Sequence, residues 1–365
     1  MLNVELKDYD DLLIEQKESP AMEKLKKIKS LHEKYRGYKN IYEEDPSMKS
    51  FITGTEMNEL IDSGMFKNPT NEDSHLHGMV NNLFHNRVQD LDTLKAQTKI
   101  LLGHDYDISN QNIEKHLYSA CQHGHFEYVK DLIENPKMAH IFLNGEQAEA
   151  RKNDQSLSWF KREQAGMTVK NNLVRASAQG LEDSAIAKNY NSTLAGLAIQ
   201  SISSQTPNDL AETIVSKNPS VLPAVIGKCQ FYNQQTFANF LGQPEVFNVL
   251  NPSCVNFLAN EQTKRMSERD NKSFDFPVAM VLMKNEVNRS HKQNLVDTAI
   301  VNKNTVFLSN VAKQTEYRFD KDQLEALREN KQVFGDVLHE ADKKELHDKL
   351  TSTMKPKHKV KAMKI

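Results

Sequence analysis

Glycine and proline are scarce in this sequence, at 13 and 11 of 365 residues. Folds built only from β-strands need more turn residues than that, so the scarcity disfavours an all-β protein. Asparagine, glutamine, lysine and leucine are plentiful instead, and this composition favours helices. With 38% hydrophobic and 26% charged residues, the chain has the composition of a water-soluble protein.

Cysteine is also rare. The three cysteines, Cys121, Cys229 and Cys254, are odd in number and widely spaced, and none belongs to a CxxC pair. A disulfide framework is therefore not expected, and the pattern predicts free, mostly buried thiols in a reducing compartment.

Long apolar runs are missing, and none approaches the roughly 18 residues that a membrane span needs. The first twenty residues have neither a basic segment nor a continuous apolar one, so no cleaved secretory signal is expected. Net charge is −2, which gives no support for nucleic-acid binding. We therefore expect a protein made in the cytoplasm, without transmembrane segments.

The sequence holds no Walker A, GxSxG, GxGxxG or kinase pattern. No cofactor, metal ligand or catalytic residue is predicted for that reason. The lack of these motifs favours a protein that is not an enzyme, with an active site too divergent to carry a known motif as the alternative.

Helical signals are abundant. Met22, Leu25, Ile28 and Leu31 have helical spacing with lysines between them, which predicts an amphipathic helix. Further along, a capping-type residue repeatedly precedes proline, a combination that suits the first turn of a helix. These pairs are Asp45-Pro46, Asn68-Pro69, Asn135-Pro136, Thr206-Pro207, Asn218-Pro219 and Asn251-Pro252.

The sequence around these pairs repeats. IVSKNPSVL (214–222) and IVNKNTVFL (300–308) agree over their first five positions except at Ser216 and Asn302. Asn218 and Asn251 lie 33 residues apart, although the other spacings are irregular. We interpret this as an array of helical hairpins with insertions.

The stretch HLYSACQHGHFEYVKDLIEN (116–135) resembles the helical part of an ankyrin repeat. The resemblance rests on Leu117, Ala120, Gly124-His125, Glu127, Val129, Leu132-Ile133 and Glu134. It departs at Tyr118, where the family usually has histidine, and it lacks the family's Thr-Pro opening. A weaker copy places Leu173, Ala176, Gly180 and Ala185 at matching spacing, and a third, 192–200, is marginal.

The resemblance implies a protein-binding scaffold without catalytic activity. Degenerate ankyrin-like arrays are common among proteins that intracellular bacteria deliver into host cells, so a host protein is the expected partner and a host cytosol the expected destination. In the best unit, the exposed positions of the first helix would be Tyr118, Gln122 and His123, which we predict to be the binding residues.

The sequence leaves three alternatives to a binding scaffold for a host protein. Cys121, His123 and His125, or His75, His77 and His85, could form a metal site, although a second ligand pair is missing. A Cys-His enzyme could be assembled across the array, with Cys254 activated by a helix N-terminus. The protein could also be an accessory or inhibitor of a bacterial partner.

The predicted fold is all-α, an irregular helical-hairpin solenoid that is ankyrin-like in the middle of the chain. We expect an N-terminal helical region (1–70), ankyrin-like repeats (71–200) with an insertion near 144–170, and further hairpins (201–335). A charged helix and a Lys-rich tail (336–365) would follow, and the tail's five lysines could make weak contact with an anionic surface.

Overall fold

The computed structural model describes residues 90–354 except 104–109, 182, 205, 230–232 and 269–273, and upstream of these only Glu23 and Lys26. The described residues are mostly helical and contain no strand. This confirms the all-α prediction. The predicted N-terminal helix, the histidines at 75, 77 and 85, and the Lys-rich tail lie outside the described residues.

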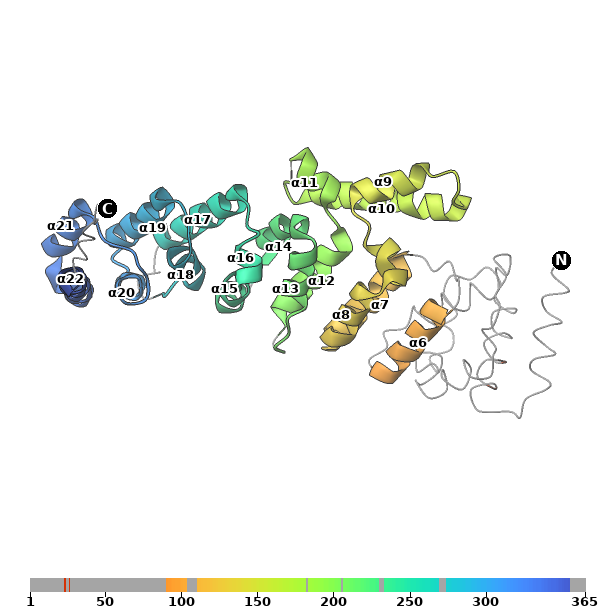
Figure 1. Cartoon of the computed structure of the whole chain (residues 1–365), viewed down its shortest axis with the longest axis horizontal. Coiled ribbons are helices and arrows are strands. Elements are labelled where there is room, and N and C mark those ends of the chain that lie inside the picture. The colour runs from red at the N-terminus through yellow and green to blue at the C-terminus, as the bar shows by residue number, and fades with distance from the viewer. Residues whose placement is uncertain are drawn as a thin grey trace, which may run out of the picture. The chain divides into compact units, whose positions relative to one another are not determined.

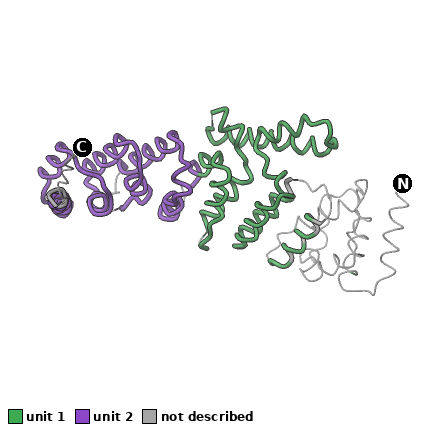
Figure 2. Tube along the Cα trace, in the orientation of Figure 1, with its two compact units in different colours: residues 1–225 green, residues 226–365 purple. Residues whose placement is uncertain are grey.

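The chain forms two compact units, residues 1–225 and 226–365 (Figure 2). The helices of the first unit (Figure 1) are α6 (Leu91–Gly103), α7 (Asn110–Gln122), α8 (Phe126–Glu134), η2 (Pro136–Phe142), α9 (Gly145–Asn153), α10 (Trp159–Ala178), α11 (Ser184–Asn189), α12 (Ser192–Ser203), α13 (Leu210–Lys217) and η3 (Pro219–Val221). Helix α14 (Leu222–Cys229) contains the boundary. The predicted segment limits at 70, 200 and 335 stay predictions.

The second unit consists of α15 (Gln234–Leu241), α16 (Pro244–Phe247), α17 (Pro252–Ser267), α18 (Pro277–Lys284), α19 (Arg289–Val301), α20 (Thr305–Gln314), α21 (Lys321–Glu329) and α22 (Lys331–Met354). Here α15 packs against α18, and α18 against α20. The charged C-terminal helix predicted from the sequence corresponds to part of α22, which bends at Phe334.

The Asn-Pro pairs mark helix starts to different degrees. Asn251 caps α17, accepting a hydrogen bond from the N–H of Cys254 at 2.8 Å, an interaction worth about 1 kcal/mol. Asn135 and Asn218 begin only 3-10 turns. The expectation was wrong for Thr206-Pro207, because α13 begins three residues later, at Leu210.

The α7–α8 hairpin contains the ankyrin-like stretch. Gly124, in the turn, has φ +78°, a conformation that costs glycine nothing. The N–H of His125 donates to the carbonyl of Ala120 at 3.0 Å and closes the turn. The same closure recurs after α10, where Gly180 has φ +71° and the N–H of Leu181 donates to the carbonyl of Ala176.

The second unit repeats this hairpin. Between α19 and α20, Lys303 takes the left-handed position with φ 55°, and the N–H of Asn304 donates to the carbonyl of Ala299 at 2.8 Å. In this register the two hairpins bury matching positions. The matched buried pairs are His116 and Leu295, Leu117 and Val296, Ala120 and Ala299, Tyr128 and Phe307, Val129 and Leu308, and Leu132 and Val311.

The region 144–170, expected as an insertion, is helical. It contains α9 and the first half of α10, which pack against each other. Asn172 ties α10 to its neighbours: its side chain donates to the carbonyl of Leu143 at 3.2 Å and accepts from the N–H of Ser192 at 3.1 Å. The proposed weaker repeat copy fits only partly, because Ala176 is buried whereas Leu173 is 47% exposed.

Candidate functional site

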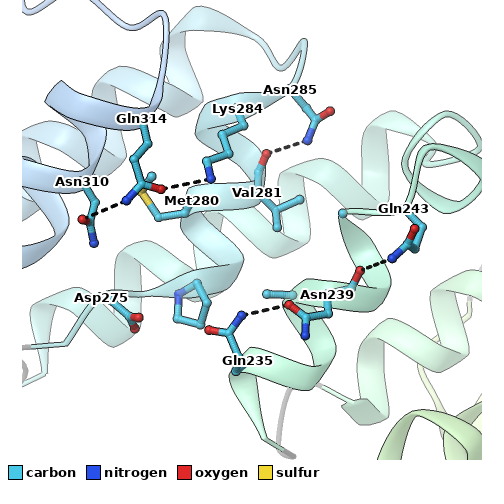
Figure 3. Close-up of a pocket in the computed structure, with 13 residues that line it drawn as sticks. Gln235, Asn239, Gln243, Asp275, Met280, Val281, Lys284, Asn285, Asn310 and Gln314 are labelled. Atoms are coloured by element: carbon cyan, nitrogen blue, oxygen red, sulfur yellow. Dashed lines mark hydrogen bonds between the residues drawn. The ribbon is translucent and has the colours of Figure 1, made fainter. Parts of the chain in front are cut away.

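A groove in the second unit is lined largely by side-chain amides (Figure 3). It has a volume of about 700 Å³, within the usual size range of ligand sites. Its polar groups come from α15, α18 and α20 and from the residues next to α15 and α18, and they are Gln235, Asn239, Gln243, Asp275, Lys284, Asn285, Asn310 and Gln314. Met280 and Val281 contribute apolar surface.

Helix geometry sets the spacing of these amides. Gln235 and Asn239 are four residues apart on α15, so their Cα atoms lie on one face of the helix about 6 Å apart, whereas Gln243 lies beyond the end of α15, directly before α16. Asn310 and Gln314 have the same spacing on α20. An extended polypeptide repeats every two residues, or about 6.7 Å. The Cα atoms that carry each pair of amides are therefore spaced at nearly the repeat of an extended backbone.

The amides orient one another. On α15, Gln235 Nε2 donates to Asn239 Oδ1 at 2.9 Å, and Gln243 Nε2 donates to the Asn239 carbonyl at 3.3 Å. On α20, Gln314 Nε2 donates to Asn310 Oδ1 at 3.2 Å. Each bond uses one N–H of an NH₂ group that carries two. The second N–H of each group is not used in these bonds, whose arrangement Figure 3 shows.

The charges of the groove are few and balanced. Lys284 Nζ donates to Gln314 Oε1 at 3.1 Å, which joins α18 to α20. Asp275 lies at the other end of α18, directly before Phe276. One cation and one anion do not suit a polyphosphate backbone, which needs a basic surface. A neutral, polar ligand with alternating donors and acceptors fits better.

Backbone strain adjoins the groove. Phe276 is in the left-handed region, with φ 47° and ψ 65°, which is rare for a bulky residue and costs roughly 1–3 kcal/mol. Its ring is buried edge-to-face against Phe307, with centroids 6.3 Å apart. This anchoring holds the turn in which Asp275 and Pro277, on either side of Phe276, line the groove.

The predicted binding residues Tyr118, Gln122 and His123 lie in the first unit. Only Gln122 is exposed, whereas Tyr118 and His123 are half-buried. The expected exposure of Tyr118 was wrong, because its side chain packs against α12: a Cβ added to Gly196 would overlap the Tyr118 hydroxyl. His123 Nδ1 is bonded to the carbonyl of Ser119 at 2.7 Å, within its own turn. Their role in binding stays a prediction.

The thiols are buried as expected. Burial raises the pKa of Cys121 and of Cys229 to about 12. It raises the pKa of Cys254 to about 11, although Cys254 lies in the first turn of α17, beside its Asn251 cap. The alternative in which the helix N-terminus lowers this pKa does not hold, because desolvation dominates. Nucleophilic catalysis needs the thiolate, which these environments disfavour.

No group of three or more metal-binding side chains comes together in the part of the chain that the structure describes. Within the described ranges, no helix is long and apolar enough to cross a membrane. No family model, no curated protein and no solved structure matches this chain.

Proposed function

We propose that this protein is a recognition scaffold that holds an extended segment of a partner protein in the amide-lined groove of its second unit. The observation that carries the proposal is the Cα spacing of Gln235 and Asn239 on α15 and of Asn310 and Gln314 on α20, which nearly matches the repeat of an extended backbone. Bonds to the main chain would supply affinity, and the apolar surface of Met280 and Val281 would select the partner's side chains.

We further propose that the architecture is an irregular array of helical hairpins, ankyrin-like at α7–α8. The support is the shared turn and matched burial of α7–α8 and α19–α20. Such hairpins bury their apolar faces by stacking on neighbours, and they expose helices and turns for binding. Tyr118, Gln122 and His123 would form a second contact region in the first unit.

Selection of displayed peptides on the full-length chain tests the groove. We expect the enriched peptides to bind as extended strands. Asn239→Ala or Gln314→Ala should each lower the affinity for these peptides roughly fivefold, which is the effect of losing a hydrogen bond of about 1 kcal/mol. Gln332→Ala is the matched control, because Gln332 is an exposed amide on α22 outside the groove. Equal affinity of all three variants and the unchanged chain would contradict the proposal.

The origin of the partner needs a separate experiment. We propose a bacterial effector that binds a host protein, based on the resemblance of 116–135 to ankyrin repeats. Parallel affinity capture from host-cell and bacterial lysates, with Asn239→Ala and Gln332→Ala baits, distinguishes the sources. A saturable host protein that is lost with Asn239→Ala supports the effector. A bacterial protein with the same behaviour indicates an accessory or inhibitor role instead.

A further inference from the structure

Helix α10 has an apolar face that the described residues of its own unit leave exposed. The large side chains on this face are Trp159, Phe160, Met167, Leu173 and Val174, with Trp159 68% and Val174 59% exposed. The opposite face of α10 is buried through Ala165, Asn172 and Ala176, and it packs against α9, α11 and α12. An apolar face of this length on a helix indicates an interaction surface.

The exposed residues follow a heptad. Pairs of positions recur every seven residues, at 159–160, 166–167 and 173–174. At about 100° per residue, these pairs border one stripe on the helix. Two charged residues, Glu163 and Lys170, occupy the centre of the stripe between successive pairs. Both are exposed, and neither has an ion-pair partner among the described residues.

The stripe is symmetric about its midpoint, between Gly166 and Met167. If a second α10 packs antiparallel on the first with the two midpoints together, each residue faces the residue of the other copy whose number adds with its own to 333. Glu163 then faces Lys170 of the other copy, and by symmetry this ion pair forms twice. The Lys152 side chain of α9 covers Gly166, 3.7 Å from where a Cβ would lie, so Met167 is the exposed apolar residue at the midpoint.

The apolar positions pair in the same register. Trp159 faces Val174 and Phe160 faces Leu173, again twice each. A parallel pairing would instead place Glu163 against Glu163 and Lys170 against Lys170, which is repulsive. Under a two-fold rotation, the charges of this stripe are complementary to those of an identical stripe. This self-complementarity favours a second copy of the chain over an unrelated partner.

We propose that α10 is a self-association surface, on which two copies of this chain form an antiparallel, two-fold symmetric helix pair. The contact is one helix pair about 22 Å long, measured from Trp159 to Val174 at about 1.5 Å per residue. Such a contact gives a dimer that forms and dissociates with concentration. This surface belongs to the first unit and is independent of the groove proposed for partner binding.

Sedimentation equilibrium of the full-length chain tests the proposal. The unchanged chain should shift from the mass of one copy towards twice that mass as concentration rises. Met167→Glu should abolish the shift, because it introduces a charge at the symmetry axis of the apolar stripe. Val301→Glu is the control: Val301 is 78% exposed on α19, outside the stripe, and its replacement should leave the shift unchanged.

Charge reversal supplies the decisive test. Glu163→Lys and Lys170→Glu should each weaken the dimer, because each places two like charges opposite one another. An equimolar mixture of the two variants should restore association, since lysine then faces glutamate at both positions. All these side chains are exposed, so circular dichroism should show unchanged helicity. A monomeric chain at every concentration, or a dimer insensitive to these charge reversals, would overturn the proposal.

Discussion

The buried imidazole of His116 is the clearest case of a single residue that links pH to stability. It lies on α7, where His116 Nε2 is 2.8 Å from the hydroxyl of Tyr128 on α8, and that hydroxyl donates to the carbonyl of Leu94 on α6 at 2.9 Å. The Thr98 hydroxyl also contacts Tyr128. Burial lowers the pKa of His116 from 6.5 to about 4, so the imidazole is neutral in the folded protein at neutral pH.

This pKa predicts a loss of stability in acid. As pH falls below about 6.5, the unfolded chain takes up a proton at His116 that the folded chain does not. The free energy of unfolding should therefore decline between pH 6.5 and 4, by about 3 kcal/mol in total. Urea denaturation across this range measures it.

A single variant isolates the effect. His116→Leu should flatten the decline, and the fold should accept it because leucine, Leu295, occupies the matching buried position of the second unit's hairpin. If the decline between pH 6.5 and 4 is the same with and without the imidazole, other groups cause it.

The cysteines give the second prediction at this scale. Because their pKa values are raised to between about 11 and 12, Cys121, Cys229 and Cys254 should react with iodoacetamide at neutral pH far more slowly than a free thiol. Unfolding in urea should make all three reactive at the ordinary rate. Mass spectrometry of the modified peptides over time measures the reaction at each cysteine. A cysteine that reacts faster than a free thiol would support the Cys-His enzyme hypothesis.

Among the elements, the left-handed turn of the repeated hairpin offers two substitutions that should change the free energy of unfolding in opposite directions. Gly124→Ala forces a side chain into φ +78° and should lower the free energy of unfolding by about 1 kcal/mol. Lys303→Gly relieves the same conformation, φ 55°, and should raise it by a similar amount, about 0.5–1 kcal/mol. Changes of the same sign in urea denaturation would mean that the two turns are not equivalent.

Local chemistry explains which elements the sequence could predict. Gly124 and Asn251 act through their own backbone and first turn, so their turn and cap were predictable from neighbouring residues. Thr206-Pro207 has the same local features, yet no helix begins there. The side chain of Asn208 bonds Ser201 at the end of α12, and its Oδ1 accepts from the N–H of Leu210 at the start of α13.

The groove was not predicted, and the reason is physical. Gln235, Asn239 and Gln243 have the spacing of one helix face, as do Asn310 and Gln314, and such polar faces are ordinarily solvated. Only packing of α15 against α18 and of α18 against α20 turns them into two walls of one groove. The sequence carried the amide spacing but not the pairing of helices that makes it a site.

In the whole molecule, we expect partner binding and self-association to use different surfaces. We propose that the groove of the second unit binds an extended segment of a partner and that α10 of the first unit binds a second copy of the chain. Two copies joined through α10 would present two grooves, which would strengthen binding to a partner with repeated segments. Met167→Glu should therefore reduce apparent affinity for a bivalent peptide without changing affinity for the single peptide, as measured by fluorescence titration.

We propose above that the amide-lined groove binds the partner. The most direct measurement is hydrogen–deuterium exchange of the full-length chain with and without a selected peptide. We predict slower exchange in α15, α18 and α20, and a clearly smaller change with Asn239→Ala when the peptide concentration is close to its dissociation constant for the unchanged chain. Protection confined to the α7–α8 turn around Gln122 and His123 would contradict the claim and place binding on the ankyrin-like hairpin instead.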